Sequence, residues 1–393
     1  MYTQNTPVHV KLWHREFWLL ALANLLLTMS VYMLIPVMPH WTLMNYSGHQ
    51  LGLMMLVHGL GLFLLGGFCS FLVQRERRNH VCLWSIVAMI LSFGLFYYAI
   101  TLNNVPFVAI LLIRLLCGAS FGLTQMVLMS TLIIDTCESF QRTEANHSAT
   151  WFGRFALSLG PLCALVLMQF GTSSLQGFDL VLLGSIVCCT VAASFIVSIH
   201  FPFKAPEDNV PKYTLDRFFL PQGKWLFLNL LLVTAAIGLL LSIPHDLVFY
   251  GMMMAGFLLA LLAQKYAFVN AELKSEVISG QILIGCALLM LLSNQKVAIN
   301  YMAPVLIGTG IGIIGARFLL FFIKLSRHCQ RGTSQSTYFL SWEFGLELGL
   351  AAGFAYTWND RETCIWASFL LIVISLIMYQ VFTHSWYLKH KNR

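Results

Sequence analysis

Charged residues are scarce in this sequence: Asp, Glu, Lys and Arg make up 10% of its 393 residues, against 58% apolar residues. A soluble domain carries about 25% charged residues, so this scarcity excludes an ordinary soluble globular protein. The ten cysteines are scattered without the spacing of metal ligands, so we expect no disulfide framework, no metal site and no cofactor. The sequence has no phosphate-binding loop of the Gly-x-x-x-x-Gly-Lys-Ser/Thr type, which argues against an ATP-driven protein.

Long apolar runs are what the sequence has in place of charge. Each is about 20 residues long, the length of helix that crosses ~30 Å of hydrocarbon. They predict twelve transmembrane helices, at residues 17–38, 51–73, 81–100, 106–134, 149–170, 179–200, 225–243, 247–266, 278–293, 298–323, 338–356 and 363–382. The run at 278–293 is the weakest because it is short. We therefore expect an all-α membrane protein.

Lys and Arg are distributed unevenly between the predicted loops. With the N-terminus inside, eighteen of the 23 lie in inner segments, only Lys296 and Arg361 lie in outer loops, and Arg114, Arg154 and Arg317 lie within spans. Cytoplasmic loops retain the positive excess. We therefore expect a multi-pass protein of a cell membrane, of the bacterial inner-membrane type, with both termini cytoplasmic. This topology accounts for the net charge of +7 without a nucleic-acid partner.

A short pattern of two glycines, a Gln-Arg pair and a tryptophan occurs twice, about half the chain apart. The first copy is Gly118, Gly122, Gln141, Arg142 and Trp151, and the second is Gly308, Gly312, Gln330, Arg331 and Trp342. Duplicated membrane units are common in secondary transporters, whose substrate site lies between the halves. We expect two pseudo-symmetric six-helix bundles, residues 1–200 and 225–393, joined by a proline-rich cytoplasmic linker at 201–224.

The fourth predicted span contains an arginine, Arg114, followed at intervals of four by Gly118 and Gly122. This spacing places all three on one helix face, where the glycines permit close approach of a neighbouring helix. An arginine inside a span costs at least ~2.5–3.5 kcal/mol on insertion scales, so it needs a partner or a wet cavity. Arg114 is therefore a candidate functional residue; the alternative is a structural charge bonded to backbone carbonyls.

The fifth predicted span carries Arg154 and then the pair Gly160-Pro161. Proline removes one backbone hydrogen bond and bends a helix, and a bent helix beside the interface of two halves is a candidate for closing a cavity. Gly-Pro kinks are also common in membrane helices generally, which is the structural alternative.

Basic and acidic residues near the inner ends of the spans are candidates for a gate. Arg75 and Arg78 follow the second span, where the simpler interpretation is a positive anchor on the cytoplasmic side. Asp135 closes the fourth span beside Arg142, and we expect it to be a gate or cap residue.

Three of these motifs resemble the major facilitator superfamily. The pattern Arg114-xxx-Gly118-xxx-Gly122 resembles that family's fourth-helix motif, and the basic turn at 70–78 stands where the family has its loop signature between helices two and three. The Gly-Pro pair of the fifth span stands where antiporter members carry a Gly-Pro motif. The resemblance covers essentially the whole chain and implies a transporter similar to drug/proton antiporters.

The sequence departs from these family motifs at two places. Ser70, Gln74 and Arg77 stand where the loop signature usually has Gly, Asp and Gly, so a gating salt bridge from the usual aspartate is absent or replaced. Residues 162–164 lack the later glycines of the antiporter motif, which weakens the antiporter assignment.

The eleventh predicted span contains the most suggestive acidic pair, Glu343 and Glu347, four residues apart on one helix face. Gly345, Gly349 and Gly353 form a stripe roughly opposite, which should pack against another helix. Two carboxylates this close in a poorly hydrated site do not both ionise cheaply. We expect at least one to hold a proton near neutral pH, as a proton-coupling site requires.

Arg317 in the tenth span is the expected partner of one carboxylate. Counted along the two spans, at 1.5 Å of rise per residue, Arg317 and Glu343 reach a similar depth near the inner side. An Arg317–Glu343 pair would leave Glu347 as the better proton carrier. The alternative is that all three residues form a purely structural ion cluster.

Four further residues are candidates for the lining of a substrate cavity: Tyr32, His58, Gln125 and Trp342. His58 lies deep in the second span, and its imidazole would suit proton handling. A lone intramembrane histidine is more often a packed, hydrogen-bonded residue.

Together these observations predict a secondary active transporter that works by alternating access, with proton-coupled efflux of a small apolar or amphipathic molecule as the leading function. Arg114, Arg154 and Arg317 would still suit a monoanion. The alternatives are a proton-coupled uptake symporter and a polytopic membrane enzyme, although the sequence has no catalytic cluster and we expect no enzyme. The expected partners are a small-molecule substrate, protons and the lipid bilayer, and the expected state is a monomer.

Overall fold

The structure is a computed structural model that describes residues 11–102, 105–171, 174–201, 210–268, 272–293, 297–327, 330–357 and 360–392. Two parts of the sequence-based expectations lie outside these ranges: residues 202–209 of the predicted linker, and Lys296 of a predicted outer loop. Within the described ranges the regular secondary structure is entirely helical. The expectation of an all-α protein is confirmed for this part of the chain.

The described residues of the first half form nine α-helices and two short turns of other helix types. They are α1 (Arg15–Tyr32), α2 (Met38–Asn45), α3 (Gly48–Leu64), the 3₁₀ turn η1 (Gly66–Phe68), α4 (Cys69–Arg75), α5 (Arg78–Thr101), α6 (Phe107–Val127), the π turn η2 (Leu128–Leu132), α7 (Ile133–Asp135), α8 (Arg142–Phe170) and α9 (Ser174–Val197).

The second half begins after the linker with the 3₁₀ turn η3 (Pro221–Gly223). It continues through α10 (Lys224–Leu241), α11 (Leu247–Leu262), η4 (Ala263–Ala267), α12 (Leu273–Leu292), α13 (Val297–Leu325), α14 (Arg331–Ala352), η6 (Gly353–Thr357), α15 (Arg361–Met378), η7 (Tyr379–Thr383) and α16 (His384–His390).

Ten helical segments in the described ranges are long and apolar enough to cross a membrane. The two other predicted spans, 17–38 and 338–356, coincide with helices α1 and α14, which are more polar. α14 contains a run of Ser, Thr and Gln at 333–337 as well as two glutamates. These two helices are more polar because both line a cavity between the two halves of the chain.

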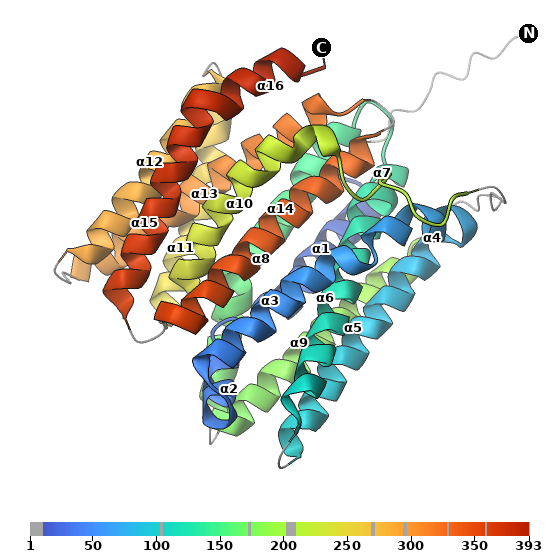
Figure 1. Cartoon of the computed structure of the whole chain (residues 1–393). Coiled ribbons are helices and arrows are strands. Elements are labelled where there is room, and N and C mark those ends of the chain that lie inside the picture. Colours follow the sequence, from blue (N-terminus) through green and yellow to red (C-terminus); the bar gives the residue numbers. More distant parts are fainter. Residues whose placement is uncertain are drawn as a thin grey trace, which may run out of the picture.

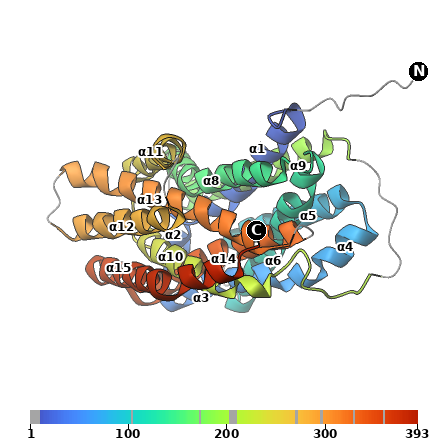
Figure 2. The same cartoon turned by 90° about the horizontal axis from the view of Figure 1, so that it is seen from above.

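The helices of the two halves lie side by side, with the first half in blue to green and the second in yellow to red (Figure 1). Seen from above, the two groups form an elongated outline (Figure 2). The main packing pairs repeat: α1 on α8, α3 on α6 and α5 on α6 in the first half match α10 on α14, α11 on α13 and α12 on α13 in the second. Between the halves, α3 packs along α14, and α8 packs along α11.

The repeated glycines occupy equivalent places in this packing. A side chain on Gly118 would collide with the carbonyl oxygen of His58, where α6 crosses α3, and one on Gly308 would collide with that of Met253, where α13 crosses α11. Only glycine permits backbones to approach so closely. The duplicated pattern seen in the sequence therefore marks the same helix crossing in each half.

Candidate functional site

A cavity lies between the two halves. Helices α1, α6 and α8 of the first half and α14 of the second supply most of its walls. Its polar lining consists of Asn24, Thr28, Gln125, Thr150, Arg154, Gln335, Tyr338, Trp342 and Glu343. The cavity thus has an arginine and a glutamate within a lining that is otherwise uncharged.

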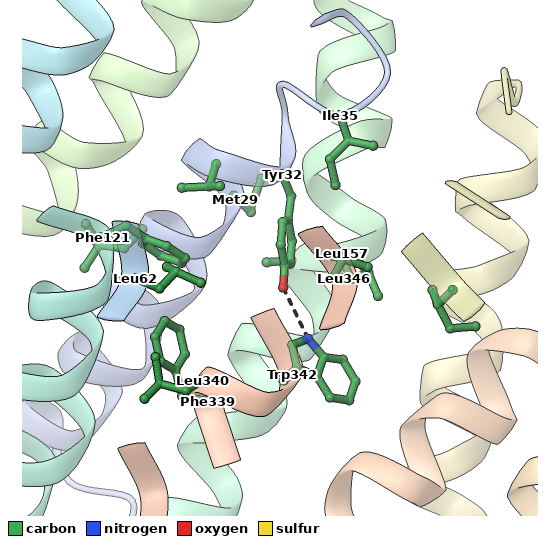
Figure 3. Close-up of a cluster of buried hydrophobic side chains, with 14 of the residues drawn as sticks. Met29, Tyr32, Ile35, Leu62, Phe121, Leu157, Phe339, Leu340, Trp342 and Leu346 are labelled. Atoms are coloured by element: carbon green, nitrogen blue, oxygen red, sulfur yellow. Dashed lines mark hydrogen bonds between the residues drawn. The ribbon is translucent and has the colours of Figure 1, made fainter. Parts of the chain in front are cut away.

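Glu343 is bonded to the opposite half through Tyr32. The Tyr32 hydroxyl on α1 donates to Glu343 Oε1 at 2.6 Å, and the indole Nε1 of Trp342 donates to the same hydroxyl at 3.2 Å. Figure 3 shows Tyr32 reaching toward Trp342 among buried apolar side chains. All three side chains are buried, so this carboxylate joins α1 to α14 away from bulk water.

Glu347 makes a second bond across the interface, with His58. Their Nδ1 and Oε1 atoms lie 2.7 Å apart, and the side chain of His58 is only 1% exposed. The neighbouring Gly59 makes this approach possible, because a side chain there would meet Glu347 Cβ at 2.9 Å. Glu347 Oε2 has no hydrogen-bond partner among the described residues, whereas the His58 imidazole also has the Cys117 thiol as a hydrogen-bonding neighbour.

The predicted pairing of Arg317 with Glu343 is wrong. Arg317 on α13 forms a two-pronged ion pair with Glu276, in the first turn of α12. Helix α12 begins at Leu273, five residues before the predicted span, which brings Glu276 into the helix beside Arg317. Similar depth along the membrane was the basis of the prediction, but depth does not say which way a side chain points around its helix.

Arg114 is buried on α6 at 3% exposure but does not line the cavity. Its Nη2 lies 3.6 Å from the sulfur of Met55 on α3, and its Nε has no partner within the described ranges. The structure therefore places it against α3, on the same helix face as Gly118.

Arg154 is buried at 2% exposure and does line the cavity. Its Nη1 donates to the carbonyl of Gly312 on α13 at 3.1 Å, and its guanidinium lies 4.0 Å from the ring centre of Trp151. In the part of the chain that the structure describes, it makes no ion pair with a carboxylate. Helix α8 continues through Pro161, and Gly160 packs against Tyr32.

Arg78 and Asp135 form an ion pair between α5 and α7. Both belong to the first half, so this pair does not join the halves. Arg75 lies 5.6 Å from the ring centre of Phe71, one turn earlier on α4. A gating role for these residues stays a prediction.

The linker makes a further contact across the halves that the sequence did not reveal. Asp216 accepts hydrogen bonds from Ser70 on α4 at 3.2 Å and from Thr333 on α14 at 3.0 Å. The next residue, Arg217, has a left-handed backbone with a φ of 57° and donates its N–H to the Thr333 hydroxyl. Ser70 stands in the altered loop signature, so a linker carboxylate connects that loop to the second half.

Replacing Asp216 with alanine should loosen this linker contact. The amides of Arg217 and Leu220 donate to Thr333 and Thr337 on α14. Losing the carboxylate that holds Thr333 should raise the hydrogen–deuterium exchange of these amides by about tenfold, equivalent to a loss of about 1.4 kcal/mol. Asp216→Asn, which keeps an acceptor oxygen, is the matched control. Equal exchange in wild type and Asp216→Ala would refute the contact.

Of the four residues predicted to line a cavity, Gln125 and Trp342 do so. Tyr32 and His58 instead bond to the two glutamates. Sequence reasoning missed five polar lining residues: Asn24, Thr28, Thr150, Gln335 and Tyr338. A usable signal existed in the polar residues Asn24 and Thr28, four apart on one face of the first span.

Comparison with known families decides the classification. The family model described as Major Facilitator Superfamily matches residues 20–350. The chain belongs to the major facilitator superfamily. This membership, predicted from the arginine-glycine helix, and the membrane-spanning helices identify a multi-pass membrane transporter rather than an enzyme. The described residues contain no group of three or more His, Cys, Asp or Glu that could hold a metal.

Solved structures of transporters share the major facilitator fold with this chain. A bacterial homologue of the iron transporter ferroportin, in an outward-facing state, has a TM-score of 0.67 at 14% identity, covering 95% of this chain and 99% of its own. A mutant of the nucleoside transporter NupG has 0.68 at 13% identity, covering 94% and 100%. A variant of the E. coli fucose:proton symporter FucP has 0.63 at 13% identity, covering 93% and 97%. At these identities the likeness shows the fold alone, and no curated protein matches the sequence.

Proposed function

We propose that this transporter is proton-coupled and works by alternating access of two six-helix bundles, residues 1–200 and 225–393, with Glu347 and Glu343 of α14 as the groups that take up the coupled proton. Twelve spanning helices follow if α1 and α14 cross the membrane with the ten more apolar segments. The repeated packing pairs of the two halves support this division. A monomer in a cell membrane, with both termini cytoplasmic, completes the proposal.

The observation that carries the proposal is that both carboxylates bond across the interface of the halves. Glu343 accepts from Tyr32 on α1, and Glu347 pairs with His58 on α3. Protonation of a carboxylate removes the charge that strengthens such bonds, so proton binding would weaken the attraction between the halves. Proton uptake would thereby be linked to the rearrangement that alternating access requires.

The direction of transport has two candidates. Efflux of a small apolar or amphipathic molecule is the function that the family resemblance implies. The cavity favours the second candidate, proton-coupled uptake, because Arg154 and Glu343 line the same space. A proton on Glu343 would neutralise its carboxylate and leave the cavity with the positive charge of Arg154. Proton binding would therefore favour the binding of an anionic substrate, and the two would be transported together.

The test uses purified protein in liposomes that contain a pH-sensitive dye. Substrates identified by thermal shift are added outside without an imposed gradient, and internal pH is followed. Acidification during uptake indicates symport and alkalinisation indicates exchange, and either supports proton coupling. Substrate flux that moves no protons and does not respond to an imposed pH gradient would overturn the proposal.

A further inference from the structure

Arg154 is a buried cation whose hydrogen-bonding capacity is incompletely used. Its contacts among the described residues are two backbone carbonyls, of Thr150 and Gly312, and the Trp151 ring. Its Nη2 has no hydrogen-bond partner there. A buried charge without an ionic partner is strongly unfavourable, and buried polar groups are nearly always bonded. The guanidinium therefore has one edge available to something that enters the cavity.

Glu343 does not fill that position. It is the acidic side chain in the cavity lining, but its Oε1 accepts the Tyr32 hydroxyl at 2.6 Å. The structure shows no ion pair between it and Arg154. The acidic and basic groups of the cavity are thus bound to different neighbours, and the arginine is the one with an unused donor.

A second unused donor lies next to Arg154. The side chains of Trp342, Arg154 and Tyr338 all lie against Gly315 on α13. A Cβ atom on Gly315 would lie 2.7 Å from Trp342 Cζ3, 3.0 Å from Arg154 Cδ and 3.1 Å from the Tyr338 hydroxyl. That hydroxyl is buried and has no hydrogen-bond partner among the described residues. An N–H donor from Arg154 and an O–H donor from Tyr338 are what the two oxygens of one carboxylate require.

Two other polar side chains of the cavity lining, Asn24 and Gln125, already donate hydrogen bonds within the protein. The Asn24 amide donates to the carbonyl of Ala149 at 2.8 Å, and the Gln125 amide donates to Thr28 at 3.1 Å. Phe339 and Met129 add apolar surface to the lining. A ligand should therefore place its charged end at Arg154 and an apolar body toward the remaining walls.

We infer that Arg154 and Tyr338 form a carboxylate-binding subsite and that the substrate is a small organic monoanion with an apolar body. The inference rests on the proposed transport function and names its substrate class. It excludes dianions such as sugar phosphates, because the described cavity lining offers one cation.

The first experiment compares carboxylates with matched neutral amides on the purified wild-type protein. The probes are butyrate, hexanoate, benzoate and 3-phenylpropionate, each with its primary amide. Binding is measured by thermal shift and by quenching of tryptophan fluorescence, because Trp151 and Trp342 border the site. At least one carboxylate should bind about tenfold or more tightly than its amide. Equal binding within every pair, or no binding by any carboxylate, would overturn the inference.

The second experiment uses variants of the two donors. Arg154→Gln should weaken carboxylate binding by about 100-fold and Tyr338→Phe by about tenfold, with binding of the amides unchanged. Tyr250→Phe, at a buried tyrosine outside this cavity, is the matched control and should bind as wild type. If Arg154→Gln does not fold, Tyr338→Phe carries the test, and wild-type affinity for carboxylates in a folded Tyr338→Phe would overturn the inference.

The two proposals fail in different ways. If carboxylates bind at Arg154 and are transported without proton movement, the proposed subsite is supported and the proposed proton coupling is refuted. Proton-coupled transport of neutral molecules, unaffected by Arg154→Gln, would leave proton coupling standing and remove the subsite.

Discussion

Replacing Glu347 with glutamine should abolish transport driven by a pH gradient while leaving substrate binding measurable. The amide keeps the shape of the side chain but can neither bind the coupled proton nor form an ion pair with His58, 2.7 Å away in wild type. With the proton-binding group lost, flux driven by an imposed pH gradient in proteoliposomes should fall by about 100-fold or more. Substrate counterflow, which needs no proton gradient, should persist.

The matched control for this variant is Glu362→Gln, an exposed glutamate in the first turn of α15. It should show normal flux in both assays. Unchanged pH-driven flux in Glu347→Gln would eliminate Glu347 as the proton carrier. If Glu343→Gln alone abolished the response, the assignment would move to the carboxylate bonded by Tyr32.

Removing Glu276 should destabilise the protein by about 3–5 kcal/mol, because it leaves the positive charge of Arg317 without its partner. Glu276 is only 1% exposed and Arg317 17%, so water compensates little of the loss. We expect Glu276→Ala to lower the yield of folded protein and its unfolding temperature in detergent. The effect should exceed that of removing any surface ion pair, which is worth about 0–1 kcal/mol.

A double variant tests whether the loss comes from the uncompensated charge. Glu276→Gln combined with Arg317→Met removes both charges and should recover much of the stability that Glu276→Ala loses. Arg217→Gln is the control, because it removes the ion pair of Arg217 with the partly exposed Asp216. It should change the stability of the protein little. Wild-type stability in Glu276→Ala would show that the ion pair is dispensable.

Helix positions followed from the sequence because each depends on local chemistry. A run of about 20 apolar residues must satisfy its backbone hydrogen bonds within itself in hydrocarbon, and ten such helices are present in the described ranges. The boundary error at α12 has the same local origin. Glu272, Lys274 and Glu276 made the first turns look like a loop, but Arg317 compensates Glu276 within the helix.

The partners of the charged residues did not follow from the sequence. Arg317 lies 41 positions from Glu276, and Tyr32 and His58 lie 311 and 289 positions from Glu343 and Glu347. Rise per residue gives the depth of a side chain in the membrane, but its partner depends on the rotation of each helix and on which helices are neighbours.

By itself, then, the sequence determined a helical membrane protein with a glycine-marked duplication, and it supplied the motif that led to the major facilitator superfamily. The length of an apolar run depends on one helix alone. The requirement for glycine at Gly118 and Gly308 depends on a single helix crossing. Only the tertiary structure decided that the α14 glutamates bond to α1 and α3, that a linker aspartate connects the halves, and that Arg154 keeps an unused donor. Those outcomes depend on how the two halves meet, and no local pattern encodes that geometry.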